Sequence, residues 1–241
     1  MNAEMQFSGK VVLVAGGTGA LGRAVSLAFL ARSAKVVVTY RHEEEFLGLQ
    51  QEAGGRYSSL EGFVLDVTDE TATQKMVGDI LAKYGRLEVL INAVGGYAGG
   101  TPLWKLEPRV FEQMLALNLR SGFVLAHAVV PAMLKQGSGV IINVASRAAF
   151  VHDRASAAYA ASKAAAVAMI DSLAADLQGT GIRANSILPS IFDTEANRKA
   201  MPEADFTKWP KPEDIASVIL FLCNDEAKLI HGAAIPVYGN F

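Results

Sequence analysis

A tyrosine and a lysine stand four residues apart in the run Tyr159-Ala160-Ala161-Ser162-Lys163, and this spacing suits acid–base chemistry. Residues 155–170 are rich in alanine, the best helix former, and predict a helix. Residues four apart on a helix share one face, one turn apart. We therefore expect the Lys163 ammonium to stabilise a phenolate and to lower the pKa of Tyr159 from about 10 toward neutrality. Such a phenol can exchange a proton with a hydroxyl or carbonyl oxygen.

A serine belongs to the same predicted site. The apolar run 140–144 is typical of a buried strand, and Ser146 follows it directly. A hydroxyl at a strand end can bond the substrate oxygen that Tyr159 would protonate. A Tyr–Lys pair at this spacing also occurs on solvated helix faces, so the chemical interpretation depends on the rest of the chain.

Length and composition exclude several classes of protein. The chain has 241 residues, of which 51% are hydrophobic, and this suits one large α/β domain over residues 1–241. A net charge of −2 argues against a nucleic-acid partner. We see no apolar stretch near the roughly 20 residues of a membrane span and no signal-peptide plan at the N-terminus. We therefore expect a cytoplasmic protein with no membrane partner and no metal site.

A glycine-rich turn lies near the start of the chain. Residues 10–15 read as a strand, residues 16–22 (GGTGALG) as the turn, and the residues up to about Ala31 as a helix. This is the context of a dinucleotide-binding turn, because glycines admit the pyrophosphate and the helix N-terminus favours its negative charge.

The second predicted strand, residues 35–40, bears on the choice of cofactor. NAD enzymes usually end this strand in an acidic residue that binds the ribose hydroxyls. Here the strand ends in Tyr40-Arg41-His42, with no acid before Glu43. Arg41 could grip a 2′-phosphate, so we expect NADP(H) to be preferred, with NAD(H) possible. The alternative is that Arg41 is a solvated loop charge.

Strands and helices alternate along the remaining chain. Strands are expected at 61–69, 87–92, 183–188 and 233–238, and helices at 70–84, 108–135, 157–178 and 212–223, with a loop at 189–209. The glycine-rich run 93–100 could lie against a flat ring, and Asn118 needs partners for its amide among apolar neighbours. The alternation predicts a doubly wound parallel sheet with helices on both faces, and a ligand at the C-terminal strand ends.

At this point the sequence resembles the short-chain dehydrogenase/reductase family over nearly its whole length. The matching positions are the turn 16–22, Asp66-Val67, Asn92, Asn118, Ser146, Tyr159, Lys163 and the segment 189–194. Ser146 precedes Tyr159 by thirteen residues, a usual interval in this family. The resemblance implies a Rossmann-type α/β fold and NAD(P)-dependent hydride transfer.

The resemblance also implies residue roles. Tyr159 would be the acid/base, Ser146 would position the substrate oxygen, and Lys163 would bind the nicotinamide ribose and acidify Tyr159. Asn118 would hold a water of the proton relay, Asp66 and Val67 would flank the adenine, and Thr194 would contact the carboxamide. Further cofactor contacts are expected at Gly16, Thr18, Gly19, Ala20, Leu21, Asn92, Ala93, Val94, Gly95, Pro189 and Ile191. We expect the substrate pocket to be lined by Tyr97, Arg147, Val151, His152, Phe192 and Trp209.

Three positions depart from the family pattern. Ala20 stands where the turn usually has its middle glycine, Ala93 replaces an asparagine, and Ser190 replaces the glycine after Pro189. The GGTGALG turn, the run AVGGYAGG and the segment 188–209 resemble dihydropteridine reductases. That subgroup generally lacks the serine of the triad, so Ser146 sets this chain apart from it.

The leading hypothesis is an NADP(H)-dependent oxidoreductase acting on a small carbonyl or alcohol. The alternatives are a dihydropteridine reductase-like enzyme and a non-catalytic dinucleotide-binding sensor. An extended epimerase or dehydratase would use the same Tyr and Lys but needs a larger C-terminal region. We also expect residues 191–209 to form a lid that is mobile without ligand and closes over the bound substrate. The alanine-rich helix and the helix carrying Asn118 should build a homotetramer or homodimer.

Overall fold

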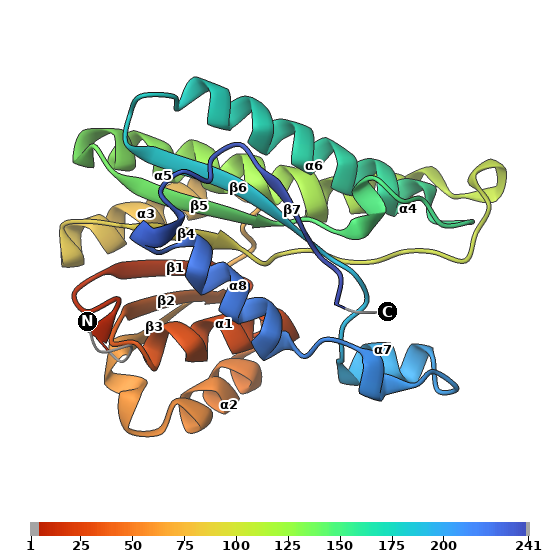
Figure 1. The fold of residues 1–241 in the computed structure, drawn as a ribbon, viewed down its shortest axis with the longest axis horizontal. Helices are drawn as coiled ribbons and strands as arrows, with labels where there is room; N and C mark the ends of the chain where they lie inside the picture. The colour runs from red at the N-terminus through yellow and green to blue at the C-terminus, as the bar shows by residue number, and fades with distance from the viewer. Residues whose placement is uncertain (1–4, 240–241) are drawn as a thin grey trace.

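The computed structural model describes residues 5–239, and residues 1–4 of the N-terminal stretch considered above lie outside it. Seven parallel strands form one sheet in the order β3-β2-β1-β4-β5-β6-β7 (Figure 1). The strands are β1 (Val11–Ala15), β2 (Lys35–Tyr40), β3 (Leu60–Val64), β4 (Val89–Asn92), β5 (Gly139–Val144), β6 (Ile182–Pro189) and β7 (Ala234–Val237). The predicted doubly wound parallel sheet is confirmed.

Helices cover both faces of this sheet (Figure 1). One layer holds α1 (Ala20–Leu30), α2 (Glu43–Ala53) and α8 (Pro212–Leu222), and the other holds α3 (Glu70–Tyr84), α5 (Ser121–Gln136) and α6 (Ala157–Asp176). In β1, Val12 and Val14 pack into the first layer while Leu13 packs into the second, because neighbouring side chains of a strand point to opposite faces. Burial on both faces explains why the strands read as continuous apolar runs.

Two helices differ from the expected pattern, and a third matches one of its two expected starts. Helix α2 was not predicted, because only Phe46, Leu49 and Ala53 of its residues are buried and its apolar periodicity is weak. Helix α6 begins at 157, as the expected range 157–178 has it, and the alanine-rich run joins the helix only there, because Ala155 has a positive φ of 56°. The expected loop 189–209 contains a further helix, α7 (Glu195–Ala200).

The predicted helix over residues 108–135 is interrupted. It consists of α4 (Pro108–Leu115), a π-helical turn (Ala116–Arg120) and α5. Contrary to our expectation, one stretch of the described chain, Pro108–Gln136, is long and apolar enough to cross a membrane by length and composition. The core helix of a globular protein meets the same criterion, and here α5 packs on the sheet through Leu125, Val129 and Met133.

The order of the strands fixes the place of the site. The chain winds outward from β1 to β3 and then returns to β4 on the other side of β1, so the crevice between the β1 and β4 ends is a switch point. The glycine-rich turn, the run 93–100, Ser146 and Pro189 all lie at the carboxyl ends of neighbouring strands. The fold therefore gathers most of the predicted site residues along one edge.

Candidate active site

The glycine-rich turn joins β1 to α1 in a tightly packed conformation. Gly16 has a φ of +73°, and a Cβ built on it would lie 3.2 Å from Val94. A Cβ on Gly22 would lie 2.0 Å from the Gly16 carbonyl oxygen, so α1 can approach the turn only at a glycine. Ala20 is exposed, and its methyl group therefore does not crowd the turn. The departure at Ala20 leaves the turn able to receive a pyrophosphate.

A cavity of about 270 Å³ extends from this turn across the strand ends. Nine of the predicted cofactor residues line it: Gly16, Thr18, Gly19, Arg41, Asp66, Val67, Ala93, Val94 and Gly95. Tyr40 and His42, which the sequence placed at the end of the second strand, line it too, whereas four further lining residues were not singled out: Thr39, Glu45, Leu65 and Leu117. The cavity and its glycine-rich wall fit the adenosine half and the pyrophosphate of a nicotinamide cofactor. The described residues contain no cluster of metal ligands.

Charged groups of both signs meet at the far end of this cavity. Arg41 is exposed at the end of β2, where it fits the predicted phosphate contact. The backbone N–H of Thr68, and then its hydroxyl and the charge of Arg41, hold the pKa of Asp66 below its ordinary value. Glu45 accepts a 2.7 Å hydrogen bond from the Thr18 hydroxyl. The sequence did not reveal Glu45, because it belongs to the unpredicted helix α2.

The other predicted cofactor residues lie outside this cavity. They are Ala20, Leu21, Asn92, Tyr159, Lys163, Pro189, Ile191 and Thr194. The Leu21 side chain packs in the core and therefore does not face the cofactor cavity. Asn92 is buried, donates to Asn143 Oδ1 at 3.0 Å and accepts from the Val94 N–H at 3.2 Å. Asn92 thus positions the loop that lines the cavity.

Ser146, Tyr159 and Lys163 come together beside the ends of β5 and β4. The Ser146 hydroxyl lies close enough to the Tyr159 hydroxyl to influence its pKa. The Lys163 Nζ lies 6.0 Å from the centre of the Tyr159 ring and donates to the Val144 carbonyl at 2.9 Å. A Cβ on Gly95 would lie 3.1 Å from this Nζ, so the glycine makes room for the lysine.

The expected acidification of Tyr159 is wrong for the protein in this form. Burial raises the pKa of Tyr159, the Ser146 hydroxyl opposes this in part, and Tyr97 adds to it. Burial also lowers the pKa of Lys163 to about 8. The buried ammonium is bonded to a backbone carbonyl and does not offset the desolvation of the phenol. Tyr159 is therefore a neutral phenol, able to donate a proton, at neutral pH.

Asn118 lies in the π-helical turn, and its side-chain amide makes three hydrogen bonds to protein groups. The Nδ2 donates to the Gly96 carbonyl and to the Ser162 hydroxyl, both at 3.0 Å, and Oδ1 accepts from the Gly96 N–H at 2.9 Å. Both Nδ2 protons are used by protein groups, whereas Oδ1 keeps a second lone pair, so the expected water contact at this side chain stays a prediction. Asn118 instead ties the loop after β4 to helix α6. Ser162, which lies between Tyr159 and Lys163 in the sequence, is the partner of Asn118 that the sequence analysis did not single out.

Four predicted substrate residues lie around this cluster. The Tyr97 ring stands 4.9 Å from the Tyr159 ring, edge to face, and is 70% exposed. Arg147 is half-buried directly after Ser146. Val151 and His152 are exposed on the loop that leads to α6. These side chains form a mixed apolar and basic rim beside the reacting groups.

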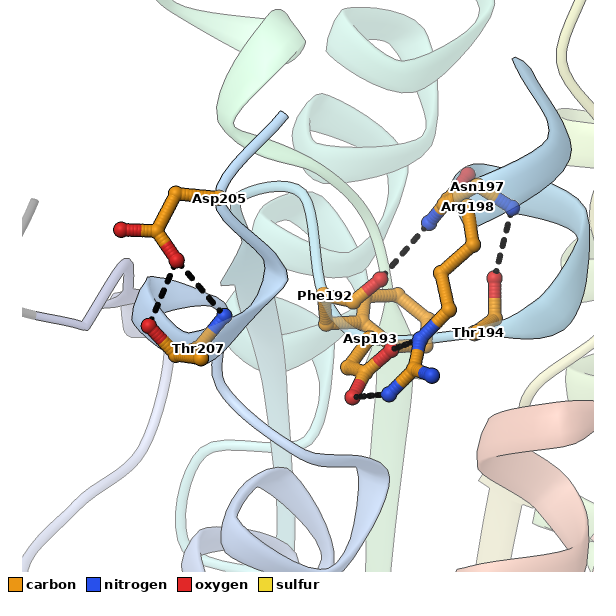
Figure 2. A network of polar contacts seen from close by, with 7 residues as sticks. All are labelled: Phe192, Asp193, Thr194, Asn197, Arg198, Asp205 and Thr207. Carbon is orange, nitrogen blue, oxygen red and sulfur yellow. Dashed lines mark hydrogen bonds and ion pairs between the residues drawn. The ribbon is translucent and has the colours of Figure 1, made fainter. Parts of the chain in front are cut away.

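The two remaining substrate residues belong to residues 190–211, which we call the β6–α8 segment. Figure 2 shows its polar contacts, in which Asp193 receives both arms of Arg198 at 2.5 and 2.6 Å. Thr194 caps α7 by accepting from the Asn197 N–H at 3.1 Å. Phe192 is partly buried against the core. Trp209 is only 8% exposed and packs on the Phe206 ring 5.0 Å away, so it supports the segment and does not line an open pocket.

The chain is similar in sequence and in structure to known proteins. The family model described as short chain dehydrogenase matches residues 10–205. The 3-oxoacyl-acyl-carrier-protein reductase FabG of Thermotoga maritima is 32% identical over 243 residues, which cover 98% of each chain. D-threitol dehydrogenase of Mycolicibacterium smegmatis is 32% identical over 247 residues, 99% of this chain and 95% of that protein. A structure of ElxO with NADP bound has a TM-score of 0.90 at 26% identity and covers 95% of this chain and 97% of its own.

Proposed function

Because this chain belongs to the short-chain dehydrogenase/reductase family, we propose that it is a carbonyl reductase that uses Ser146, Tyr159 and Lys163. Members of the family are NAD(P)-dependent enzymes, so the non-catalytic sensor is set aside. The observation that carries the proposal is the meeting of a serine hydroxyl, a neutral phenol and a buried lysine at one point of the sheet edge.

The protein groups have distinct parts in this reaction. The bound cofactor supplies the hydride that reaches the substrate carbon. The Ser146 hydroxyl accepts from the Ala148 N–H at 3.1 Å, which leaves its own proton to bond the carbonyl oxygen. Tyr159 has a raised pKa and donates the proton that this oxygen takes up. Two hydrogen bonds position the face of helix α6 that carries Tyr159: Lys163 donates to the Val144 carbonyl, and Asn118 donates to the Ser162 hydroxyl. Alcohol oxidation would run the same steps in reverse.

NADP(H) is the proposed cofactor, in preference to NAD(H). Tyr40 occupies the position at which an acid would bind the ribose hydroxyls, and Arg41 offers a planar fork for phosphate oxygens. The related ElxO structure, with NADP bound, supports the same choice. Glu45 lines the same cavity and weighs against it, because its carboxylate repels a 2′-phosphate. The preference should therefore be moderate.

We also propose a homotetramer or, second, a homodimer, in which α6 and the α4–α5 helix form subunit contacts. The exposed side of α6 includes small residues such as Ala161 and Ala168, which permit close helix packing. Phe111 and Phe123 on the other helix are 38% and 51% exposed. Small residues beside large exposed apolar ones suit a symmetric interface.

The deciding experiment removes one hydroxyl. Tyr159→Phe should lower turnover about 10²-fold or more, the scale of positioned acid catalysis, while cofactor binding stays near wild type. Substrates are found first by following NADPH oxidation with simple ketones, quinones, 3-oxoacyl thioesters and quinonoid dihydropterin. Full turnover in Tyr159→Phe would refute the mechanism. A marked preference for quinonoid dihydropterin would replace the carbonyl reductase with the pteridine alternative.

A further inference from the structure

Arg147 directly follows Ser146, and its backbone is fixed relative to the reacting groups. It begins a 3-10 turn, Arg147–Ala149, in which the Ser146 hydroxyl accepts from the Ala148 N–H at 3.1 Å. The Phe150 and Val151 N–H groups both donate to the Arg147 carbonyl at 3.0 Å. The side chain of Arg147 therefore projects from a rigid turn that also sets the Ser146 hydroxyl.

Arg147 is a half-buried residue, and its guanidinium has no acidic partner among residues 5–239. None of the ion pairs or side-chain hydrogen bonds found there includes it, although the group carries five N–H donors. Arg183, another half-buried arginine, instead donates to three backbone carbonyls. A guanidinium that has no acceptor within the described chain is free to bind an anion from outside it.

An aromatic ring holds this guanidinium in place. The Arg147 Cζ lies 6.0 Å from the centre of the Tyr238 ring, a cation–π distance. Tyr238 packs on a small apolar cluster with Ala145, Ala149, Val167 and Leu188. Its carbonyl accepts from the Ser190 hydroxyl at 2.8 Å. Ser190, one of the departures from the family pattern, thus anchors the ring on which Arg147 rests.

No ion pair joins Arg147 to the β6–α8 segment, and three of the four acidic side chains of that segment already have partners. In the β6–α8 segment, Asp193 is paired with Arg198 (Figure 2), Glu195 with Lys199 and Asp205 with Lys208. The loop between Ser146 and α6 carries two further basic side chains, His152 and Arg154, against the single acid Asp153. Of the basic side chains on this loop, Arg147 is half-buried, whereas His152 and Arg154 are exposed.

We propose that the substrate is a carbonyl compound or alcohol that carries a carboxylate or phosphate group, and that Arg147 binds this group. The inference rests on the proposed reductase function and adds the class of its substrate. Adjacent Cα atoms are 3.8 Å apart and an arginine side chain reaches about 6 Å, so the guanidinium lies within about 10 Å of the Ser146 Cα, and the anionic group belongs on a short chain from the reacting carbonyl. Short oxo acids and phosphorylated ketones meet this requirement.

The test compares matched substrates that differ only in charge. The first pair is levulinate and its methyl ester, and the second is dihydroxyacetone phosphate and dihydroxyacetone. Wild-type protein with NADPH should favour the charged member of at least one pair by about 10- to 100-fold in kcat/KM, the scale of a charge-assisted hydrogen bond. The pair that shows the preference identifies the group as carboxylate or phosphate.

Arg147→Gln should bring this ratio close to one, mainly by raising KM for the charged substrate. Arg154→Gln is the matched control, because Arg154 is an exposed cation on the same loop and its loss should leave the ratio unchanged. Equal use of charged and neutral substrates by the wild type would overturn the inference, and so would a ratio that Arg147→Gln leaves intact.

A binding measurement separates this inference from the reductase proposal. Pentanoate and pentanamide cannot be reduced, and calorimetry with NADP⁺-loaded protein should show pentanoate binding that Arg147→Gln weakens about tenfold or more. If that result came without turnover of any ketone, the reductase proposal would fail while the anion site stood. If pentanoate and phosphate both failed to bind to the wild type, the anion site would fail, whatever the ketone assays gave.

Discussion

Replacing the buried Lys163 with methionine should stabilise the protein while it removes a residue of the proposed catalytic set. Lys163 is 5% exposed, and burial lowers its pKa from 10.5 to about 8. At about 1.4 kcal/mol for each tenfold change in proton affinity, keeping the charged form in the fold costs about 3 kcal/mol at pH 7. Lys163→Met avoids this cost but loses the hydrogen bond to Val144, worth about 1 kcal/mol. The net gain is about 2 kcal/mol, or roughly 5 °C in Tm for a chain of this size.

The sign of the pH dependence provides the sharper test. The folded pKa lies below the unfolded one, so between pH 8 and 10.5 the unfolded state binds more protons and the wild type gains stability as pH rises. The advantage of Lys163→Met should therefore be full below pH 8 and shrink toward pH 10.5. Denaturant unfolding at pH 7, 8, 9 and 10 measures it, with exposed Lys135→Met as the control. A less stable variant at pH 7, or a difference that does not vary with pH, would refute this reasoning.

Three further predictions concern the cofactor, the β6–α8 segment and assembly. Arg41→Ala should lower the affinity for NADPH relative to NADH by about 10- to 100-fold, and Glu45→Gln should raise it about 2- to 5-fold, as measured by fluorescence titration. An unchanged ratio in Arg41→Ala would mean that Arg41 is only a solvated charge. Amide hydrogen exchange in residues 190–211 should slow when cofactor and substrate are both bound, because the segment closes over them, and equal rates would contradict closure. Sedimentation at micromolar concentration should show a tetramer or dimer, and a monomer would exclude the proposed interface.

Local sequence patterns predicted the helices and strands whose ends are marked by capping residues or by a clear apolar run. The bounds of α3 agree with its expected range because Asp69 caps its start, accepting from the Ala72 N–H, and Gly85 ends it with a φ of 74°. Strand β2 was found because both of its faces are apolar. Helix α2 was missed because it lies over the edge of the sheet and buries only three side chains, so no strong period marks it.

The properties that sequence could not supply depend on partners distant along the chain. The spacing of Tyr159 and Lys163 placed them on one helix face, but the direction of their pKa shifts follows from burial under other elements. Asn118 was singled out, yet its partners, Gly96 and Ser162, are 22 and 44 residues away. Such contacts arise only when the strands are brought side by side, and no local pattern encodes them.

The β6–α8 segment has a consequence for how this scaffold can acquire new substrates. A 2.8 Å hydrogen bond from the Asp193 N–H to the Pro210 carbonyl joins the two ends of the segment, so the chain enters and leaves it at nearly the same place. Within the described chain, the side-chain hydrogen bonds and ion pairs of residues 193–208 stay inside the segment. A unit that ends where it begins and makes its ion pairs within itself can be exchanged as a block. Recombination between relatives could therefore swap this loop and its specificity in one step, while the sheet and the reacting groups keep their positions.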